Sequence, residues 1–465
     1  MPLVSVLIAI AILLVLVHAL KLDAFFALIL TAFVVGIMNG MDVLGVLQSL
    51  LKGIGATLGN VALVLVFGAM LGRLVGESGA ARAIAEWLVR ISGTRRMQFA
   101  MAATGILVGM PMLYNAGFIV VIPLVYSVAA TTGLPLVSLG LPLASGLSVT
   151  HGFLPPHPAP TFMAFVYGAN MSQTHALGMV VMVPAVLLGG VYLTRMLTRF
   201  RVAQGSVPKE LNEDHPIDPA HLPSVGISVF TILVPVFLML FGGLVDALTH
   251  TTGIDPFRPD YDFRAGLAAA VPDAALRAFV IGTKFVGNAN VALFVAVFVA
   301  LYTLGRRRGR TMPQLMESLR HGVAGVATIL MLIAAGGAFS QVLRDAGVGN
   351  YVAARAAGMQ LNPLLLAFGV ASLLRLAVGS ATVAGMTTAG LVAPMVAASG
   401  VSPELMVLAT GAGSLMFSHF NDTGFWMFKE YFNLTIPQTF ATWSVMEMGV
   451  ALVGMGVVLA MYAVG

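Results

Sequence analysis

The stretch Ser148-Val-Thr-His-Gly-Phe-Leu-Pro-Pro-His-Pro158 lies inside a long segment, residues 97–194, that contains no Lys, Arg, Asp or Glu. A water-exposed domain of ordinary composition would not stay uncharged over this length, so we expect the segment to lie within a lipid bilayer. The four prolines and two histidines of residues 151–160 would interrupt any helix there. Irregular backbone at membrane depth is tolerated only where it lines a cavity or is buried in protein. The stretch therefore predicts a broken helix at a transport site.

The composition of the whole chain is that of a polytopic membrane protein. Of its 465 residues, 58% are hydrophobic and 9% are charged, and the mean hydropathy is +0.96. The net charge of +5 indicates no nucleic-acid partner, because the basic residues fall mostly between apolar runs. The chain has no Cys, which excludes disulfides and thiolate metal sites, and we expect no cofactor. The run Leu3–Ala19 lacks a basic n-region and a cleavage site, so we interpret it as a first span.

Apolar runs that approach the length of a transmembrane helix recur along the chain. They are 3–20, 24–41, 54–72, 98–110, 116–131, 135–150 and 176–194 in the first half, and 225–249, 278–304, 322–343, 361–378, 385–398, 402–418 and 440–463 in the second. Several are too short or too rich in Gly and Pro to cross fully. We therefore expect an all-α fold with about 11–14 membrane elements, including broken or re-entrant helices.

Three polar stretches separate these runs: 195–224, 250–277 and 306–320. The third begins with Arg306-Arg-Arg-Gly-Arg310, and the positive-inside rule places the first and third in the cytoplasm. The two apolar runs between them return the chain to the same side, so the assignment is consistent. The expected organisation is a first transport repeat (1–195), a polar cytoplasmic linker (196–224) and a second transport repeat (225–465).

An internal repeat supports this division. Residues 62–79 resemble residues 330–347, and the final glycines are separated by 268 positions (347 − 79 = 268). At the same offset His151 falls on His419 and Glu77 falls on Asp345. Duplicated halves are a common plan of secondary transporters, and we expect the two halves to be inverted relative to each other.

Two segments at equivalent points of the halves carry hydroxyl and imidazole groups. The first is Thr150-His151 with His157, at the proline-broken helix end, where freed carbonyls and imidazoles could hydrogen-bond a polyhydroxy acid. The second is Ser418-His-Phe-Asn-Asp422, which brings His419, Asn421 and Asp422 to an apolar border. An ionisable group at that depth is costly unless it is used or paired. The alternatives are a kink with locally satisfied histidines and an interfacial turn.

Two further breaks and one acid complete the candidate set. Gly379-Ser380-Ala-Thr382 precedes an apolar run and could expose helix N-terminal N–H groups to a carboxylate, with Arg375 as a bidentate partner. The alternative is a snorkelling Arg with Ser and Thr packed between helices. Tyr114-Asn115 lies in a Pro- and Gly-containing interruption, for which packing is the default role. Glu447 lies inside the last apolar run and is either a proton carrier or an ion-pair partner.

Enzymes and channels are disfavoured by the spacing of these residues. His151 and His157 have no carboxylate nearby and are not the helical His-x-x-x-His pair of a zinc site. Ser418, His419 and Asp422 are too close in sequence to converge as a hydrolase triad, and no nucleophile elbow is present. No filter motif of a channel is evident. We expect neither catalytic nor metal-binding residues.

The chain resembles the gluconate permease (GntP-type) family of gluconate:proton symporters. The matching segments are 55–59, 67–72, 147–158, 374–384, 400–407, 419–426 and 428–436. The resemblance implies a multi-pass secondary carrier of the ion-transporter type in the bacterial inner membrane, with inverted repeats and sugar acids as substrates. Relatives that carry D-serine differ around 419–426. One departure concerns Leu113-Tyr-Asn-Ala-Gly-Phe118, where gluconate permeases usually have Glu in place of Asn115, and Asn cannot titrate.

These observations give one main hypothesis, proton-coupled symport of gluconate or a related small hydroxy acid. The expected substrate-binding residues are Tyr114, Asn115, Thr150, His151, His157, Arg375, Ser380, Thr382, His419 and Asn421, and those for proton coupling are Asp422, His151 and Glu447. The alternatives are a permease for D-serine or another small hydroxy or amino acid, and an uncoupled facilitator that has lost its proton site with the Glu. The expected partners are the carboxylate substrate, protons and lipid; a homo-oligomer is left open.

Overall fold

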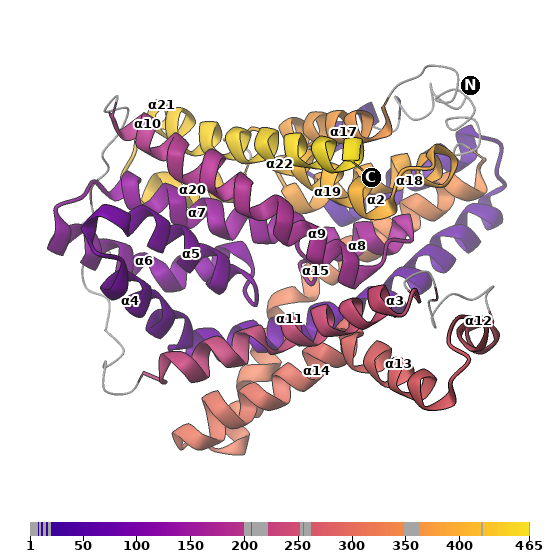
Figure 1. The fold of residues 1–465 in the computed structure, drawn as a ribbon. Coiled ribbons are helices and arrows are strands. Elements are labelled where there is room, and N and C mark those ends of the chain that lie inside the picture. The colour runs from indigo at the N-terminus through magenta and orange to yellow at the C-terminus, as the bar shows by residue number, and fades with distance from the viewer. Residues whose placement is uncertain are drawn as a thin grey trace.

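The computed structural model describes residues 20–199, 222–251, 262–347, 362–419 and 422–464, together with positions 8, 11, 12, 15, 16, 206 and 254. Within these residues the chain is helical and contains no strand (Figure 1). Eight described helices are long and apolar enough to cross a membrane, and three shorter apolar helices join them. The predicted all-α polytopic architecture is therefore confirmed. Most of the first expected span, 3–20, and most of the expected linker, 196–224, fall outside the described residues.

The helices of the first half follow one another with short connections. They are α2 (Ala24–Met38), α3 (Val43–Glu77), α4 (Ala80–Ser92), α5 (Met97–Gly109), α6 (Tyr114–Thr132), α7 (Leu136–Phe153), α8 (Pro158–Tyr167), α9 (Met171–Pro184) and α10 (Leu193–Arg199), with a π-helical segment, Ala185–Tyr192, between the last two.

The second half contains the same kinds of element. They are α11 (Val225–Leu248), α12 (Phe263–Ala270), α13 (Ala274–Gly287), α14 (Ala289–Ala300), α15 (Met312–Asp345), α17 (Pro363–Val378), α18 (Ala381–Ser399), α19 (Pro403–Leu415), α20 (Thr423–Tyr431), α21 (Ile436–Thr439) and α22 (Val445–Val464). Figure 1 shows that the halves are not separate bodies, because α18 and α19 pack with α8 and α9.

The uncharged stretch forms the centre of the molecule. In the most apolar window of Leu136–Tyr167, 94% of the residues are buried inside the protein, whereas no other candidate span exceeds 50%. The expected break is present, because α7 ends at Phe153 and α8 begins at Pro158. Proline is well suited to the first position of a helix, because an N–H group there would have no hydrogen-bond partner within the helix. Gly146 of α7 lies so close to α5 that an added Cβ would be 2.5 Å from the carbonyl oxygen of Ala102. These small residues allow α5 and α7 to pack backbone to backbone.

The two longest helices, α3 and α15, form an antiparallel pair whose contacts are reciprocal. The Ser49 hydroxyl in the second turn of α3 donates to Asp345 Oδ2 at the end of α15, at 2.7 Å. The Ser318 hydroxyl in the second turn of α15 donates in the same way to Glu77 at the end of α3. Exchanged contacts of this kind are what a two-fold axis across an antiparallel pair would produce. These contacts support inverted repeats. We propose this inversion together with the division of the chain into the two repeats 1–195 and 225–465.

Close backbone contact at this crossing gives a stability prediction. A Cβ added at Gly53 would be 2.5 Å from the carbonyl oxygen of Gly337 and 2.7 Å from the Cα of Ala338, so Gly53→Ala forces the helices apart. We expect a loss of about 1–3 kcal/mol, seen as a lower thermal unfolding midpoint in detergent. Gly55 is the matched control, since nothing lies within 4 Å of its added Cβ. Equal midpoints for Gly53→Ala and Gly55→Ala would contradict the packing argument.

Candidate functional site

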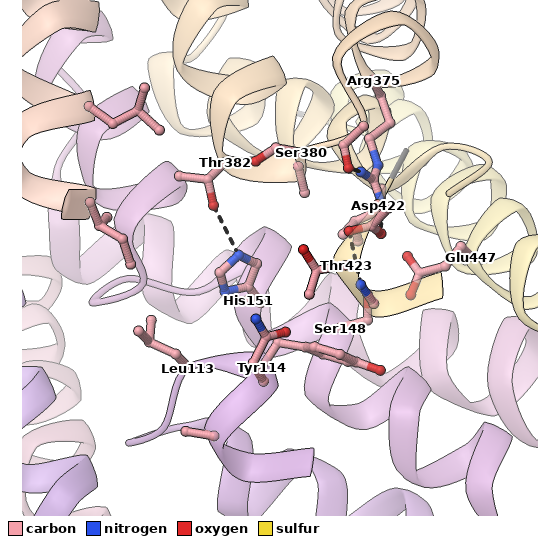
Figure 2. A pocket seen from close by; sticks show the side chains of 18 of the residues that line it. Leu113, Tyr114, Ser148, His151, Arg375, Ser380, Thr382, Asp422, Thr423 and Glu447 are labelled. Atoms are coloured by element: carbon pink, nitrogen blue, oxygen red, sulfur yellow. Dashed lines mark hydrogen bonds and ion pairs between the residues drawn. The ribbon is translucent and has the colours of Figure 1, made fainter. Parts of the chain in front are cut away.

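A cavity of about 500 Å³ lies where elements of both halves meet (Figure 2). This volume is in the range of small-molecule sites, about 300–1,000 Å³. The polar residues that line it are Tyr114, Asn115, Ser148, His151, Arg375, Ser380, Thr382, Asp422, Thr423, Trp443 and Glu447. Residues from α6 and α7 therefore face residues from α18, α20 and α22 across one space. The remaining lining residues are apolar or glycine, and α15 contributes three of them, Gly325, Ile329 and Leu332.

Two helices at equivalent points of the halves begin at this cavity. α6 begins at Tyr114 and α18 begins at Ala381, 267 positions later (381 − 114 = 267). Their N-cap residues, Leu113 and Ser380, both line the cavity, and the Ser380 hydroxyl accepts a hydrogen bond from Val383 N at 3.3 Å. A helix N-terminus carries unpaired N–H groups and about half a positive charge. Both ends therefore favour a carboxylate in the cavity.

Arg375 and Asp422 form a buried ion pair on one wall. Arg375 Nη2 lies 2.5 Å from Asp422 Oδ2, and the arginine side chain is only 3% exposed. Its Nη1 donates to the carbonyl oxygen of Gly379, while its Nε has no hydrogen-bond partner among the described residues. Asp422 caps α20 by accepting from Gly424 N at 3.1 Å, and it also accepts from the Ser418 hydroxyl. Asp422 is thus held as a fixed acceptor, and Arg375 keeps one N–H for a ligand.

The two histidines of the quoted stretch have different surroundings. His151, in the last turn of α7, has its Nε2 3.2 Å from Thr382 Oγ1, and its buried Nδ1 has no partner among the described residues. His157 does not line the cavity; its Nε2 lies 2.8 Å from the carbonyl oxygen of Gly109. The two rings pack edge to face with centroids 5.3 Å apart. His157 is therefore placed behind His151, where it supports the ring that faces the cavity.

Two other predicted residues, Thr150 and His419, do not line the cavity. The Thr150 hydroxyl donates to Leu147 O at 2.8 Å inside α7. His419 Nε2 lies 2.8 Å from the carbonyl oxygen of Leu376, next to Arg375 in sequence. Asn421 lies outside the described residues. The other predicted residues all line the one cavity: Tyr114, Asn115, His151, Arg375, Ser380, Thr382, Asp422 and Glu447.

Glu447 and Tyr114 are buried polar groups without strong partners. Glu447 is 1% exposed, and neither carboxyl oxygen has a hydrogen bond within 3.5 Å to a described residue. The Ser148 hydroxyl interacts with this carboxyl group without meeting the geometry of a hydrogen bond. Tyr114 is 8% exposed and its hydroxyl has no partner among the described residues, while its ring packs on Trp443 with centroids 5.6 Å apart. A buried unsatisfied polar group costs about 1–3 kcal/mol, so several around one cavity indicate a polar ligand.

Sequence reasoning missed three polar lining residues: Ser148, Thr423 and Trp443. Ser148 belongs to the quoted stretch and lies three positions before His151, a spacing that places both on one helix face and that could have identified it. Trp443 donates from Nε1 to Ser418 Oγ at 2.8 Å and so supports the Asp422 region. No group of three or more His, Cys, Asp or Glu within the described part of the chain is arranged to hold a metal ion.

The comparisons with known proteins agree over the full length of the chain. The model of the GntP family of permeases matches residues 1–464. The chain is 43% identical over 464 residues to the Gnt-II system L-idonate transporter of Escherichia coli K12, with 100% of both chains covered. It is 40% identical to a high-affinity gluconate transporter of the same organism, with 98% of each chain covered. It is 38% identical to the gluconate permease of Bacillus subtilis, with 99% of each covered.

Two solved structures share the fold. The YdaH transporter of Alcanivorax borkumensis superimposes with a TM-score of 0.65 at 19% identity, covering 95% of this chain and 98% of that chain. MtrF of Neisseria gonorrhoeae, described with a class of antimetabolite efflux pumps, gives a TM-score of 0.63 at 14% identity, with 93% of each chain covered. At these identities the likeness concerns the fold alone.

Proposed function

The chain belongs to the GntP permease family, and from this premise we propose that it is a proton-coupled symporter of gluconate or a closely related hydroxy acid. It is a multi-pass membrane permease and not an enzyme, and in bacteria the family resides in the inner membrane. The observation that carries the substrate proposal is the cavity itself. Two helix N-termini begin at it, and the residues that line it include Tyr114, His151 and Arg375, each of which carries a buried polar atom without a hydrogen-bond partner among the described residues.

Each part of a sugar acid has a matching part of the cavity in this proposal. The carboxylate would lie at the N-terminus of α18, between Ser380, Thr382 and the free Nε of Arg375. The hydroxyl groups would bond to His151 Nδ1, the Tyr114 hydroxyl and the Asn115 amide, which offer donors and acceptors. His157 would act by positioning His151, and we assign Thr150 and His419 to the supporting wall.

For proton coupling we place Glu447 ahead of Asp422 and His151. Asp422 is occupied by Arg375, the Gly424 N–H and the Ser418 hydroxyl, so protonation would disrupt the wall that it organises. Glu447 lines the same cavity without a hydrogen bond of that strength. An isolated carboxyl group at membrane depth is a proton-carrier candidate by default. This order reverses the expectation from the sequence, which put Asp422 and His151 first.

Uptake into proteoliposomes tests the proposal. With an inward proton gradient, labelled gluconate is expected to accumulate above its external concentration, and a protonophore is expected to abolish the accumulation. Excess L-idonate is expected to compete with gluconate, because a relative at 43% identity is named for L-idonate. Excess D-serine is not expected to compete. Equilibration without accumulation would support the uncoupled facilitator instead. Chemically altered gluconate inside the vesicles, or inhibition by D-serine but not by L-idonate, would contradict the proposal.

A further inference from the structure

A second cavity of about 500 Å³ adjoins the substrate cavity. Leu113, Ala116 and Gly325 line both, so these three residues form the boundary between the two spaces. From this boundary the second cavity extends between α3, α6 and α15. Its polar lining residues are Arg73, Glu77 and His321. A solute that leaves the substrate cavity in this direction would pass these charged side chains.

The charges beside this second cavity do not cancel. Arg73 Nε lies 2.5 Å from Glu77 Oε1, and Arg310 Nη2 lies 2.9 Å from Glu77 Oε2. One carboxylate therefore serves two guanidinium groups, and the Ser318 hydroxyl donates to it as well. Arg310 Nη1 is buried without a partner among the described residues.

The neighbouring charges at the mouth leave this excess in place. Glu317 pairs with Arg320 at 2.9 Å and contacts His321 at 3.1 Å, so this group adds no net negative charge. Arg73 has 48% of its side chain exposed, which leaves its remaining N–H groups accessible from the cavity. A cavity with low-dielectric walls and one excess positive charge concentrates anions.

We propose that Arg73 forms a second, transient binding site for the carboxylate of the substrate, at the cytoplasmic mouth of the transport path, while Arg310 balances the charge of Glu77 beside it. This proposal rests on the anionic substrate of the proposed function. The side of the membrane follows from Arg310, which ends the basic run Arg306–Arg310 that the positive-inside rule places in the cytoplasm. An anion leaving the substrate cavity would exchange its contact with Arg375 for one with Arg73 before it reaches water.

Sided exchange measurements test this site. Labelled gluconate exchange against unlabelled gluconate is measured without a proton gradient, in intact cells and in inside-out membrane vesicles. Arg73→Gln is expected to raise the KM about tenfold in inside-out vesicles at low ionic strength, and clearly less at high salt. The KM in intact cells is expected to change less than about twofold. Arg73→Lys keeps the charge and is expected to retain most of the affinity.

Arg82→Gln is the matched control, because Arg82 also pairs at i,i+4 through Nε, at 2.7 Å from Glu86 Oε1, but lines neither cavity. Arg73→Gln leaves Glu77 bonded to Arg310 and Ser318, so the fold is expected to persist. Equal KM changes on both sides, or changes no larger than those of Arg82→Gln, would overturn the second site. A change confined to intact cells would overturn its cytoplasmic position. Wild-type protein that exchanges no gluconate in either preparation would contradict the proposed function itself.

Discussion

Arg375→Gln is expected to lower gluconate uptake at least about a hundredfold, which corresponds to about 2.8 kcal/mol at 1.4 kcal/mol per factor of ten. Arg375 lines the substrate cavity, is 3% exposed and has a buried Nε without a partner among the described residues, so we expect it to make a charge-assisted hydrogen bond to the carboxylate. Glutamine removes that bond and also leaves the Asp422 carboxylate without its counter-charge. The measurement is initial uptake of labelled gluconate into proteoliposomes that contain equal amounts of protein.

A second variant separates substrate binding from support of the wall. Removing one partner of a buried ion pair costs about 3–5 kcal/mol, because the other charge is left uncompensated. Arg375→Gln combined with Asp422→Asn removes both charges and is expected to recover most of the thermal stability that the single variant loses. Transport is not expected to recover, since the double variant still lacks the arginine that binds the carboxylate of the substrate. Recovery of uptake together with stability would show that Arg375 acts only through Asp422.

The location of the breaks could be predicted from the sequence, because Pro and Gly act locally on the backbone. The interruption between α7 and α8 and the start of α18 after Gly379 were both expected. The length of α3 was not. The apolar run predicted 54–72, whereas the helix covers Val43–Glu77. Its first turns, which contain Gln48, Ser49 and Lys52, pack against α15, and hydropathy does not report on such a contact between distant segments.

The sequence could predict many residues of the site, but it could not predict which of these residues contact one another. Glu447 and Asp422 both stood out as acids beside or within apolar sequence, and both line the cavity. The sequence could not show that Arg375 neutralises Asp422, because 47 positions separate the two residues and only the tertiary fold brings the last turn of α17 to the N-cap of α20. It also could not show that His157 faces Gly109 O and not the cavity. Side-chain direction after a proline-broken turn depends on tertiary contacts.

Glu447→Gln is expected to abolish proton-driven accumulation while leaving exchange close to wild type. Glutamine has nearly the same shape as protonated glutamate, and Glu447 has no hydrogen bond within 3.5 Å to a described residue whose loss would disturb the wall. A permanently neutral side chain can neither bind nor release a proton. Gluconate inside proteoliposomes should therefore reach only the external concentration, a ratio of about one, under an inward proton gradient.

Comparison with two other acids makes this test specific. Glu404→Gln is the control, because Glu404 does not line the cavity. Its Oε1 accepts a hydrogen bond from Asn170 N at 2.8 Å, and a glutamine side chain can accept the same bond. The Glu404→Gln variant should accumulate gluconate normally. Asp422→Asn should lose exchange and accumulation together, because it breaks the pair with Arg375. If Asp422→Asn instead keeps exchange and loses accumulation, while Glu447→Gln accumulates normally, the coupling role belongs to Asp422.

The Glu447 experiment also decides what the absence of a titratable side chain at position 115 means. Asn115 at the start of α6 and Glu447 in α22 line the same cavity, although they come from opposite halves of the chain. A proton site needs only to share the space of the substrate, so that each changes the affinity for the other. Coupling that is lost with Glu447→Gln would therefore show that the carboxylate of α22 supplies the proton site without a glutamate on α6. Coupling that survives would require one of the remaining cavity groups, His151 or Asp422, to carry the proton.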